Sequence, residues 1–154
     1  MNSADALRTR MRGAYCLVAL LPKQTRIRVG AIGRHDFRPG AYVYIGSALG
    51  GIEKRVGRHK SNKKRKKWHI DYLLAKAEVL STISIPCDGR DVECEVARAL
   101  VDCEGASIPV KRFGSSDCKC ASHLLYFGNV DAEWVLEELS MRLSMLKCVY
   151  PMRL

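Results

Sequence analysis

An arginine and a histidine stand four residues apart in a strongly basic segment, at Arg55 and His59. In a helix, side chains four residues apart project from one face, so this spacing sets a permanent cation beside a titratable imidazole. Such a pair suits chemistry on a phosphate group and its leaving group. The alternative is an exposed basic helix that contacts phosphates without chemistry, and spacing alone favours that simpler interpretation.

A second candidate is a cysteine-rich loop, in which Cys118 and Cys120 precede His123 and follow Asp117. Zinc prefers thiolate and imidazole ligands in a tetrahedron, although C-x-x-C is its commoner spacing. A fourth ligand would have to be Asp117 or a distant cysteine such as Cys94. The alternative is a loop with buried thiols and no metal. The H-x-E and P-C-x-x-C motifs of zinc deaminases do not occur in the sequence, which excludes that class.

The segment WHIDY, residues 68–72, carries a third candidate at the start of a predicted helix. His69 directly follows a lysine run, so we treat it as a secondary site residue, and Asp71 could orient an imidazole. In the alternative interpretation the aromatic residues of this segment pack into the core and His69 has no role.

The positive charge of the chain is concentrated in one place. The formal net charge is +10, and between Glu53 and Lys67 nine basic residues face a single acid. A dense positive patch of this kind is typical of proteins that bind phosphate backbones. Because only one aromatic residue adjoins it, we expect backbone contacts rather than base stacking. The basic residues are Lys54, Arg55, Arg58, Lys60, Lys63, Lys64, Arg65, Lys66 and Lys67.

The composition indicates one globular domain. The chain has 154 residues, of which 47% are hydrophobic, enough for one core and too few for two ordinary domains. No apolar run reaches the roughly 18 residues that a membrane span needs, and residues 1–12 lack the apolar stretch of a secretory signal. The seven cysteines, an odd number, suit a reducing compartment, where most would be buried hydrophobes. We therefore expect a cytoplasmic protein without a membrane anchor.

The hydrophobic pattern predicts an α/β fold. Strands are expected at 13–21, 25–32 and 41–46, forming an antiparallel meander of three. Within the third strand, Tyr42 and Tyr44 should face one side, with Val43 and Ile45 on the other.

Four helices are expected around these strands. The first begins near residue 52, the second covers 68–77, and the third runs from 91 to 103 with Asp91 as its N-cap. Further strands are expected at 78–86 and 123–127, separated by a loop over 113–120. The last helix follows Asp131, its cap, and its apolar stripe is Ala132, Val135, Leu136, Leu139, Leu143 and Leu146.

The order of these features carries a resemblance. GAY at 13–15, YIG at 44–46 and then Arg55 with His59 resemble the GIY-YIG nuclease superfamily over roughly residues 13–125. The pieces YVYIGSALGG, RHK, WHIDYLL and FGSSDCKCASHL resemble one prokaryotic branch of it, whose members stand alone or are fused to endonuclease III-like glycosylases. Three departures are visible: the two tripeptides lie unusually far apart, alanine replaces the first isoleucine, and the closing asparagine has no clear counterpart.

The resemblance implies a fold and a metal ligand. The fold would be a small, central, mainly antiparallel sheet flanked by helices, with an extra N-terminal hairpin strand and a C-terminal amphipathic helix. Glu93, near the start of the third helix, would bind Mg²⁺ or Mn²⁺ through carboxylate oxygens. Glu95 is a rival, but a hydrophobic pair follows Glu93 at the expected offset, so we prefer Glu93.

The resemblance also implies roles for four other residues. Arg55 would clamp the scissile phosphate and offset the charge that grows in the transition state. Tyr15 would help to activate the attacking water, with Tyr44 and His59 orienting or shuttling the proton. A free phenol titrates near pH ~10, so Tyr15 needs help from a nearby cation or a metal ion to act as a base.

Together these features predict a metal-dependent DNA endonuclease, acting in DNA repair. The predicted organisation is an N-terminal extension (1–12), a nuclease domain (13–128) and a helix packed on that domain (129–154). Two alternatives remain: a non-catalytic DNA- or RNA-binding module on the same fold, and a zinc-stabilised RNA-binding protein. Expected partners are duplex or branched DNA, with RNA as a competitor, and an endonuclease III-like repair enzyme; the chain itself would be a monomer or weak dimer.

Overall fold

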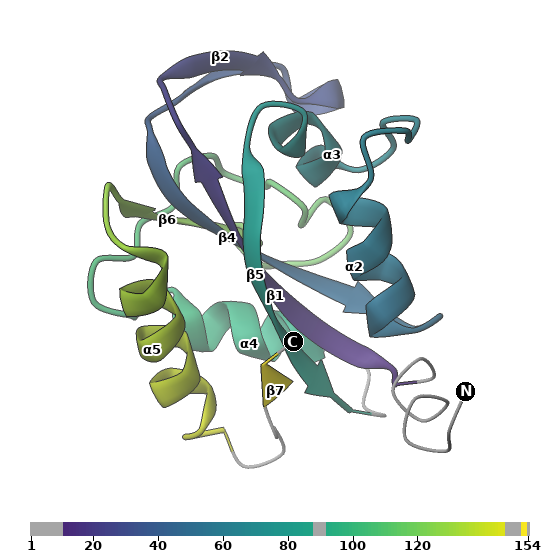
Figure 1. Ribbon diagram of the computed structural model, residues 1–154, viewed down its shortest axis with the longest axis vertical. Coiled ribbons are helices and arrows are strands. Elements are labelled where there is room, and N and C mark those ends of the chain that lie inside the picture. Colours follow the sequence, from purple (N-terminus) through teal and green to yellow (C-terminus); the bar gives the residue numbers. More distant parts are fainter. Residues whose placement is uncertain (1–10, 88–91, 147–151, 154) are drawn as a thin grey trace.

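The computed structural model describes residues 11–87, 92–146 and 152–153 and has a five-stranded antiparallel sheet at its centre (Figure 1). This is the α/β fold with an antiparallel sheet flanked by helices that the sequence predicts. The strands, in order across the sheet, are β6 (Leu124–Gly128), β4 (Gly40–Ala48), β1 (Gly13–Leu21), β5 (Glu78–Pro86) and β7 (Met152–Arg153).

The prediction of a three-stranded meander is wrong for its middle strand, which does not lie between the other two. β1 pairs directly with β4 along its whole length, from Gly13 opposite Ala48 to Leu21 opposite Gly40. The chain between them forms a separate hairpin of β2 (Thr25–Arg28) and β3 (Arg34–Phe37). The predicted strand 25–32 stops early because two glycines with positive φ, Gly30 at 47° and Gly33 at 84°, turn the chain back through the short 3₁₀ helix η1 (Gly30–Ile32).

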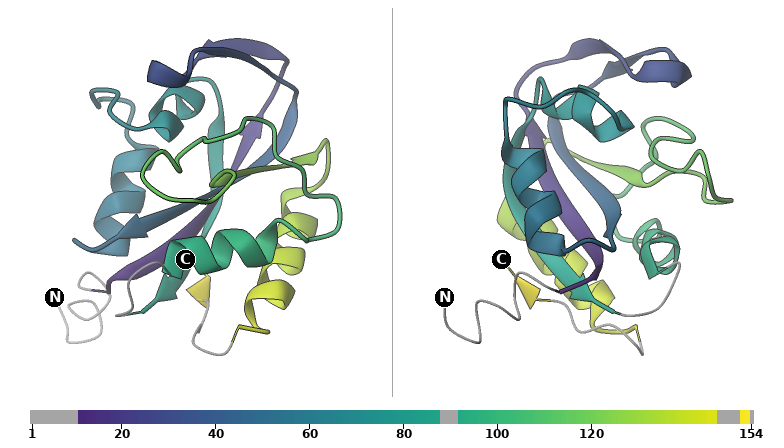
Figure 2. Two further views of the ribbon diagram at one scale, coloured as in Figure 1. Left: turned by 180° about the vertical axis from the view of Figure 1, so that it is seen from behind. Right: turned by 90° about the vertical axis from the view of Figure 1, so that its right-hand side faces the viewer.

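Two hydrophobic clusters cover the two faces of the sheet. The alternation along β1 sends Tyr15 and Leu17 to the face covered by α2 (Ile52–Lys60) and α3 (His69–Leu74). Cys16 and Val18 go to the face covered by α4 (Val92–Leu100) and α5 (Ala132–Leu143). Figure 2 shows α2 and α4 on opposite sides of the strands. The predicted division of β4 is confirmed, since Val43 and Ile45 share the second cluster while Tyr42 and Tyr44 belong to the first.

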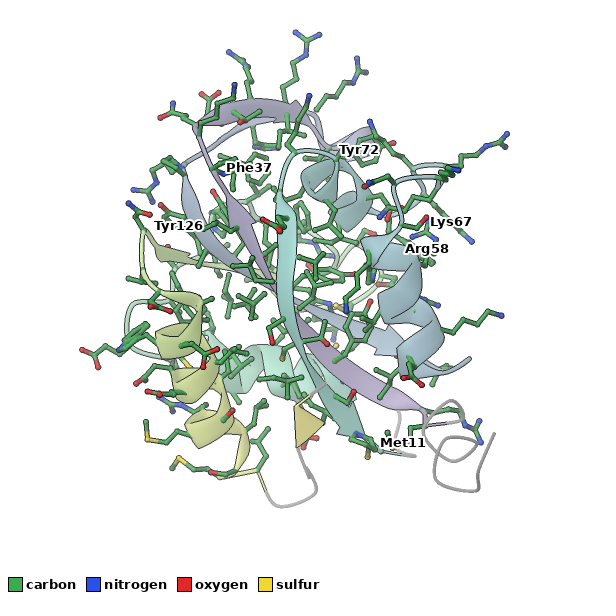
Figure 3. The ribbon with its side chains drawn as sticks, viewed as in Figure 1. Met11, Phe37, Arg58, Lys67, Tyr72 and Tyr126 are labelled. Carbon is green, nitrogen blue, oxygen red and sulfur yellow. The ribbon has the colours of Figure 1, made fainter. Side chains whose placement is uncertain are left out.

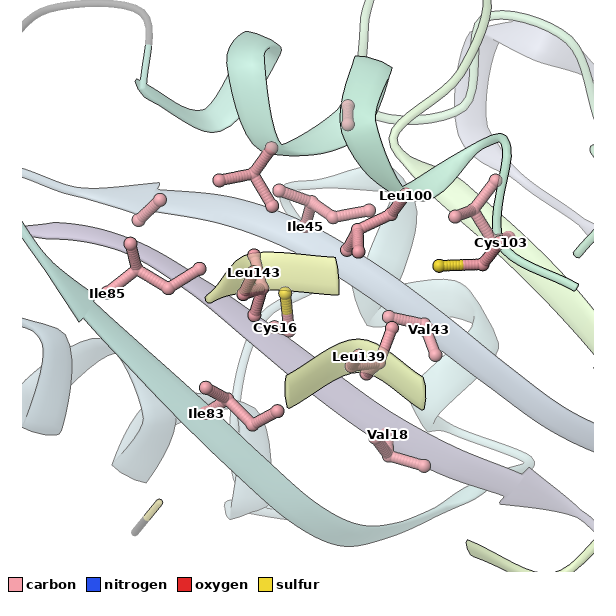
Figure 4. Packing of buried hydrophobic residues seen from close by; sticks show 14 of the residues in the cluster. Cys16, Val18, Val43, Ile45, Ile83, Ile85, Leu100, Cys103, Leu139 and Leu143 are labelled. Atoms are coloured by element: carbon pink, nitrogen blue, oxygen red, sulfur yellow. The ribbon is translucent and has the colours of Figure 1, made fainter. Parts of the chain in front are cut away.

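The C-terminal helix shares the core of the sheet. Leu139 and Leu143 of α5 lie against Cys16 and Ile83 of β1 and β5 (Figure 4), and both leucines have no exposed surface. Burying each leucine contributes on the order of 2 kcal/mol. The predicted cap is confirmed, because the Asp131 carboxylate accepts a hydrogen bond of 2.7 Å from the N–H of Glu133.

The second and third helices are shorter than predicted. α3 ends at Leu74 rather than at residue 77, and α4 ends at Leu100 rather than at residue 103. In both places the chain continues in a tighter turn with a bond three residues back: the Lys76 N–H donates to the Leu73 carbonyl, and the Cys103 N–H donates to that of Leu100. The predicted cap Asp91 lies outside the described residues. None of the described helices has the length and apolar character needed to cross a bilayer.

Candidate active site and metal centre

A pocket of about 340 Å³ opens beside the C-terminal half of β4, where its pairing with β6 ends at Tyr44. Residues from β4, α2, α3, α4 and the loop after Phe113 meet there, although they are widely separated in the sequence. The predicted site residues Tyr44, Arg55, His69 and Glu93 are all in its wall. The full lining is Tyr44, Ser47, Arg55, Lys67, Trp68, His69, Glu93, Gly114, Ser116 and Asp117.

The other two predicted site residues, Tyr15 and His59, form a buried pair outside this lining. The Tyr15 hydroxyl lies 2.5 Å from Nε2 of His59, and the two side chains are 1% and 2% exposed. The Tyr44 ring contacts both, with ring centroids 6.3 Å from Tyr15 and 6.0 Å from His59. Tyr44, which lines the pocket, therefore also packs against the hydrogen-bonded tyrosine–histidine pair behind it.

The environment of this pair sets its protonation. Burial raises the pKa of Tyr15, with a further contribution from Tyr44 and an opposing one from Arg55. Burial also lowers the pKa of His59 to about 4, and the cations Lys64 and Arg55 act in the same direction. At neutral pH the phenol is therefore protonated and the imidazole is neutral, so the hydroxyl can donate to Nε2.

Arg55 reaches the pocket from α2 and is held by a carbonyl and an aromatic ring. Its Nη1 donates to the Ser47 carbonyl over 3.3 Å, and its guanidinium lies 4.2 Å from the centroid of the Trp68 ring. Cation–π contact fixes the group without consuming the donors that a phosphate would use. This arrangement could hold an anion in the pocket.

Glu93 is the carboxylate that α4 presents to the pocket. It is partly buried and lines the cavity, whereas Glu95, two residues further on, is exposed. Because α4 turns by about 100° per residue, positions two apart point in different directions. Asp117 adds a second carboxylate to the lining. Sequence reasoning assigned Asp117 only to the cysteine loop and missed its place here, since no local pattern relates it to Glu93.

His69 fastens the loop that closes the pocket. Its Nδ1 accepts a hydrogen bond of 2.8 Å from the N–H of Gly114, and burial lowers its pKa. Gly114 has a φ of 70°, and a side chain there would press on the Tyr44 ring. His69 therefore supports the wall of the pocket as well as lining it.

The sequence suggested that Asp71 could orient an imidazole, but its carboxylate pairs with an arginine instead. It is fully buried and accepts hydrogen bonds of 2.8 and 3.0 Å from the guanidinium of Arg58. It also accepts from the backbone N–H groups of Lys67 and Trp68, which cap the start of α3. Although burial acts to raise the pKa of Asp71, these hydrogen bonds lower it below its usual value. Asp71 therefore ties both ends of the polybasic loop 61–67 together.

The predicted nucleic-acid-binding residues divide into two groups. Arg58 is held by Asp71, and Lys64 donates to the carbonyls of Arg58 and His59 at the end of α2, so both have structural contacts. Figure 3 shows Arg58 and Lys67 together on this side of the molecule. The remaining residues are exposed: Lys54, Lys60, Lys63, Arg65, Lys66 and Lys67.

The β2–β3 hairpin enlarges the basic surface, which the sequence did not reveal. A second hollow, of about 360 Å³, is lined by Arg26 and Arg28 of β2 together with Lys66, Lys76 and Tyr72. The hairpin lies over α3 (Figure 1), so residues some forty positions apart share this surface. Local charge counting cannot find such a surface, because it is assembled by tertiary packing.

The cysteine loop forms a second cluster of ligand atoms. One atom each from Cys94, Cys118, Cys120 and His123 lies within 4.8 Å of the other three, a group that could hold a metal ion such as zinc. The fourth candidate ligand is thus Cys94 of α4, while Asp117 faces the pocket instead. In a tetrahedral zinc–thiolate site the sulfurs are about 3.8 Å apart, so only small movements would close this cluster around an ion.

Burial raises the pKa of two thiols of this cluster, those of Cys94 and Cys120, and so favours their protonated form. Burial raises the pKa of Cys94 to about 12, with contributions from Cys120 and Cys118. An ion bound there would have to displace these protons, as metal ions do at thiolate sites. Cys16 and Cys103, by contrast, are buried in the hydrophobic core, as the sequence predicted for most of the cysteines.

A comparison with protein-family models matched one family, described as a domain of unknown function, DUF123, over residues 14–145. The chain belongs to the DUF123 family. Searches of curated proteins and of solved structures found no match. The DUF123 match includes the pocket and the cysteine–histidine cluster, so both sites lie within the family's domain.

Proposed function

We propose that this DUF123 chain is a metal-dependent DNA endonuclease of the GIY-YIG type, which hydrolyses phosphodiester bonds. The observation that carries the proposal is the meeting of Tyr44, Arg55 and Glu93 in one pocket, backed by the Tyr15–His59 pair. A guanidinium can stabilise charge on a phosphate, a carboxylate can hold the metal ion that activates water, and a phenol can orient that water, so one cavity offers three groups suited to phosphodiester hydrolysis. Their combination is more specific than any one of them.

The pocket offers ligands that fit a hard divalent cation. Glu93 and Asp117 both line it, and Mg²⁺ or Mn²⁺ is commonly held by one or two carboxylates with water completing the shell. A bound ion would supply Lewis-acid polarisation of the phosphate and of a coordinated water. Arg55, already oriented by Ser47 and Trp68, would bind the phosphate oxygens and offset the charge that develops on them.

The Tyr15–His59 pair could accept the proton that the attacking water loses. Tyr44 would orient the attacking water at the pocket wall. Tyr15 would accept a proton from the water side while its own hydroxyl proton passes to Nε2 of His59, 2.5 Å away. Because His59 is neutral at neutral pH, its Nε2 can accept the proton, and its lowered pKa favours releasing that proton again. Charge then does not have to remain on a buried phenolate, which the raised pKa of Tyr15 makes costly.

The exposed cations around loop 61–67 and the β2–β3 hairpin support DNA as the substrate. Neither Lys63 nor Arg65 is held by an acidic partner among the described residues, and the second hollow has no acidic residue in its lining. A surface with this charge attracts a phosphate backbone whatever its sequence. We therefore propose duplex or branched DNA as the substrate class.

We further propose that zinc occupies the Cys94, Cys118, Cys120 and His123 cluster. Three sulfurs and one imidazole nitrogen are a donor set that selects zinc over Mg²⁺ and Mn²⁺. Four protein ligands leave no open position, which is typical of a structural site. Metal analysis of the purified protein should find one equivalent of zinc, and Cys118→Ser should lower it.

The test of the nuclease is cleavage of a labelled DNA panel containing single-stranded, duplex, flap and four-way-junction forms, with Mg²⁺, Mn²⁺ or EDTA. Wild type is compared with Glu93→Ala and with Glu95→Ala, the matched control on the exposed side of α4. Metal-dependent cleavage by wild type and Glu95→Ala, but not by Glu93→Ala, is expected. Equal cleavage by all three would contradict the role of Glu93.

A non-catalytic DNA- or RNA-binding module is the second candidate, and one observation favours it. Tyr15 is 1% exposed, and its pKa is raised rather than lowered, so the phenol is not preset as a base. A binding module would bind the panel in a salt-sensitive way without cleaving it, and Glu93→Ala would bind as well as wild type.

A further inference from the structure

His123 lies between the two candidate metal sites and faces both of them. Its Nε2 is 3.8 Å from the Cys94 sulfur and 3.6 Å from the Cys118 sulfur. Its Nδ1, on the other side of the ring, is 3.9 Å from Oε2 of Glu93. The residue is 1% exposed, and Nδ1 has no hydrogen-bond partner among the described residues, which leaves the Glu93 carboxylate as an ion-pair contact at 3.9 Å. One imidazole therefore bridges the sulfur-rich cluster and the pocket carboxylate.

Glu93 and Cys94 are adjacent on α4, so the backbone also connects the pocket to the sulfur-rich cluster. Cys94 belongs to the sulfur-rich cluster, and Glu93, the preceding residue, lines the pocket. An ion held by Cys94 would fix the first turn of α4, which carries Glu93. The carboxylate is thus tied to the cluster twice, once through its backbone and once through the His123 ring.

The loop 113–120 makes a third connection. Gly114, Ser116 and Asp117 line the pocket, and the next residues, Cys118 and Cys120, belong to the cluster. Arg112 closes this loop, since its Nη1 donates to the carbonyls of Cys118 and Cys120 over 2.6 and 2.9 Å. An ion bound by both cysteines would hold the loop from its other end, and with it the pocket wall.

We propose that zinc in the Cys94, Cys118, Cys120 and His123 cluster controls the binding of the second metal ion at Glu93. Coordination through Nε2 would leave the proton on Nδ1, where it can donate to Glu93, the pairing commonly found behind metal-bound histidines. Here the carboxylate that receives this hydrogen bond is itself the ligand of the pocket. Zinc binding would therefore fix both the orientation of Glu93 and the loop carrying Asp117. This regulation rests on the proposed divalent-metal site in the pocket.

The test measures Mn²⁺ binding directly, by electron paramagnetic resonance, in the protein loaded with zinc and in the same protein after zinc removal. Circular dichroism and denaturant unfolding are recorded for both forms. The zinc-loaded form should bind Mn²⁺ at least about tenfold more tightly, the size of effect typical when a partner of a metal ligand is lost. Re-addition of one equivalent of zinc should restore the affinity, and Glu93→Gln should lose the Mn²⁺ site while keeping its zinc.

If zinc removal unfolds the chain, the coupling is tested by a second measurement on the zinc-loaded protein. Coupling between two sites is reciprocal, so Mn²⁺ in the pocket must tighten zinc binding by the same factor. The zinc affinity is therefore measured by equilibrium competition with a zinc-selective chelator, with and without Mn²⁺, using Glu93→Gln as the control in which Mn²⁺ should have no effect. Lys111→Ala, an exposed change two residues before this loop and outside the linings of both sites, should behave as wild type.

The outcomes separate this inference from the proposed nuclease. Equal Mn²⁺ affinity with and without zinc, a zinc affinity that Mn²⁺ does not change, or the absence of stoichiometric zinc would each overturn the coupling. Cleavage that persists unchanged in the zinc-free protein would do so as well, while leaving the nuclease proposal intact. Coupled Mn²⁺ and zinc binding without cleavage of any DNA would support the coupling and reject the nuclease.

Discussion

Gly46 lies directly opposite Tyr15 in the β1–β4 pairing, and a Cβ atom at Gly46 would overlap the phenol ring. The glycine of YIG therefore makes room for the tyrosine of GAY, and Tyr44, two residues earlier on the same face, contacts the same ring. Residues of both tripeptides therefore position the Tyr15 side chain against His59.

Gly46→Ala should displace the Tyr15 ring. We expect a loss of about 1–3 kcal/mol in the free energy of unfolding, the usual cost of overpacking a core, together with a loss of DNA cleavage. Gly57→Ala is the control, because that helical glycine has open space around it and alanine there should stabilise α2 by up to about 1 kcal/mol. Denaturant unfolding of both variants checks the prediction, and equal stabilities would contradict it.

Tyr15→Phe should separate chemistry from binding. The change removes the hydroxyl that pairs with Nε2 of His59 but keeps the ring in place. We expect DNA cleavage to fall by about 10²–10⁴-fold, the usual contribution of a proton-transferring group, with DNA affinity unchanged. Cleavage rates and binding isotherms measured in the same buffer test this. Normal cleavage by the variant would remove Tyr15 from the mechanism.

His59 should make the stability of the fold depend on pH. Its pKa is lowered by burial from 6.5 to about 4 in the folded chain, so below pH 6.5 the unfolded chain binds a proton that the folded chain does not. Stability should therefore fall as the pH drops from 6.5 to about 4, by up to about 3 kcal/mol, and this loss should not grow further below that pH.

The measurement is denaturant unfolding of wild type and His59→Gln across this range. Other groups also titrate here, so the difference between the two proteins is the informative quantity. That difference should shrink steadily as the pH falls, because glutamine carries no titrating proton. A difference that stays constant across the whole range would show that His59 does not titrate as its burial implies.

Asp71→Asn should destabilise the chain by about 3 kcal/mol, because it leaves the Arg58 guanidinium partly buried without its counter-charge. Asp36→Asn is a matched control: the Arg26–Asp36 pair is 4.0 Å apart with both side chains mostly exposed, so it should cost less than about 1 kcal/mol. Thermal or denaturant unfolding compares the two. A similar small effect of both would show that Asp71 does not secure the polybasic loop.

DNA binding should weaken steeply with salt. If about five exposed cations contact phosphates of a duplex, the logarithm of the affinity should fall with a slope near −4.5 against the logarithm of the salt concentration. Lys63→Ala and Arg28→Ala should each reduce the steepness by about one unit if both the loop and the hairpin contact DNA. Arg98→Ala, an exposed change on α4, should leave the slope unchanged. A flat salt response would contradict the assigned interface.

The sequence by itself determined the features that depend on local period and local chemistry. Alternation placed Tyr42 and Tyr44 on one face of β4, and a 3.6-residue stripe behind an Asp131 cap placed α5. These elements are specified by residues close to one another, so a pattern in the chain is enough to find them.

Only the tertiary structure decided the contacts between distant segments. The register that sets Tyr15 opposite Gly46 skips a whole hairpin, and Cys94 joins a loop more than twenty residues away. Asp71 pairs with Arg58 instead of an imidazole for the same reason. Such partners are chosen by the burial and hydrogen bonding of the packed chain as a whole, and no local period carries that information.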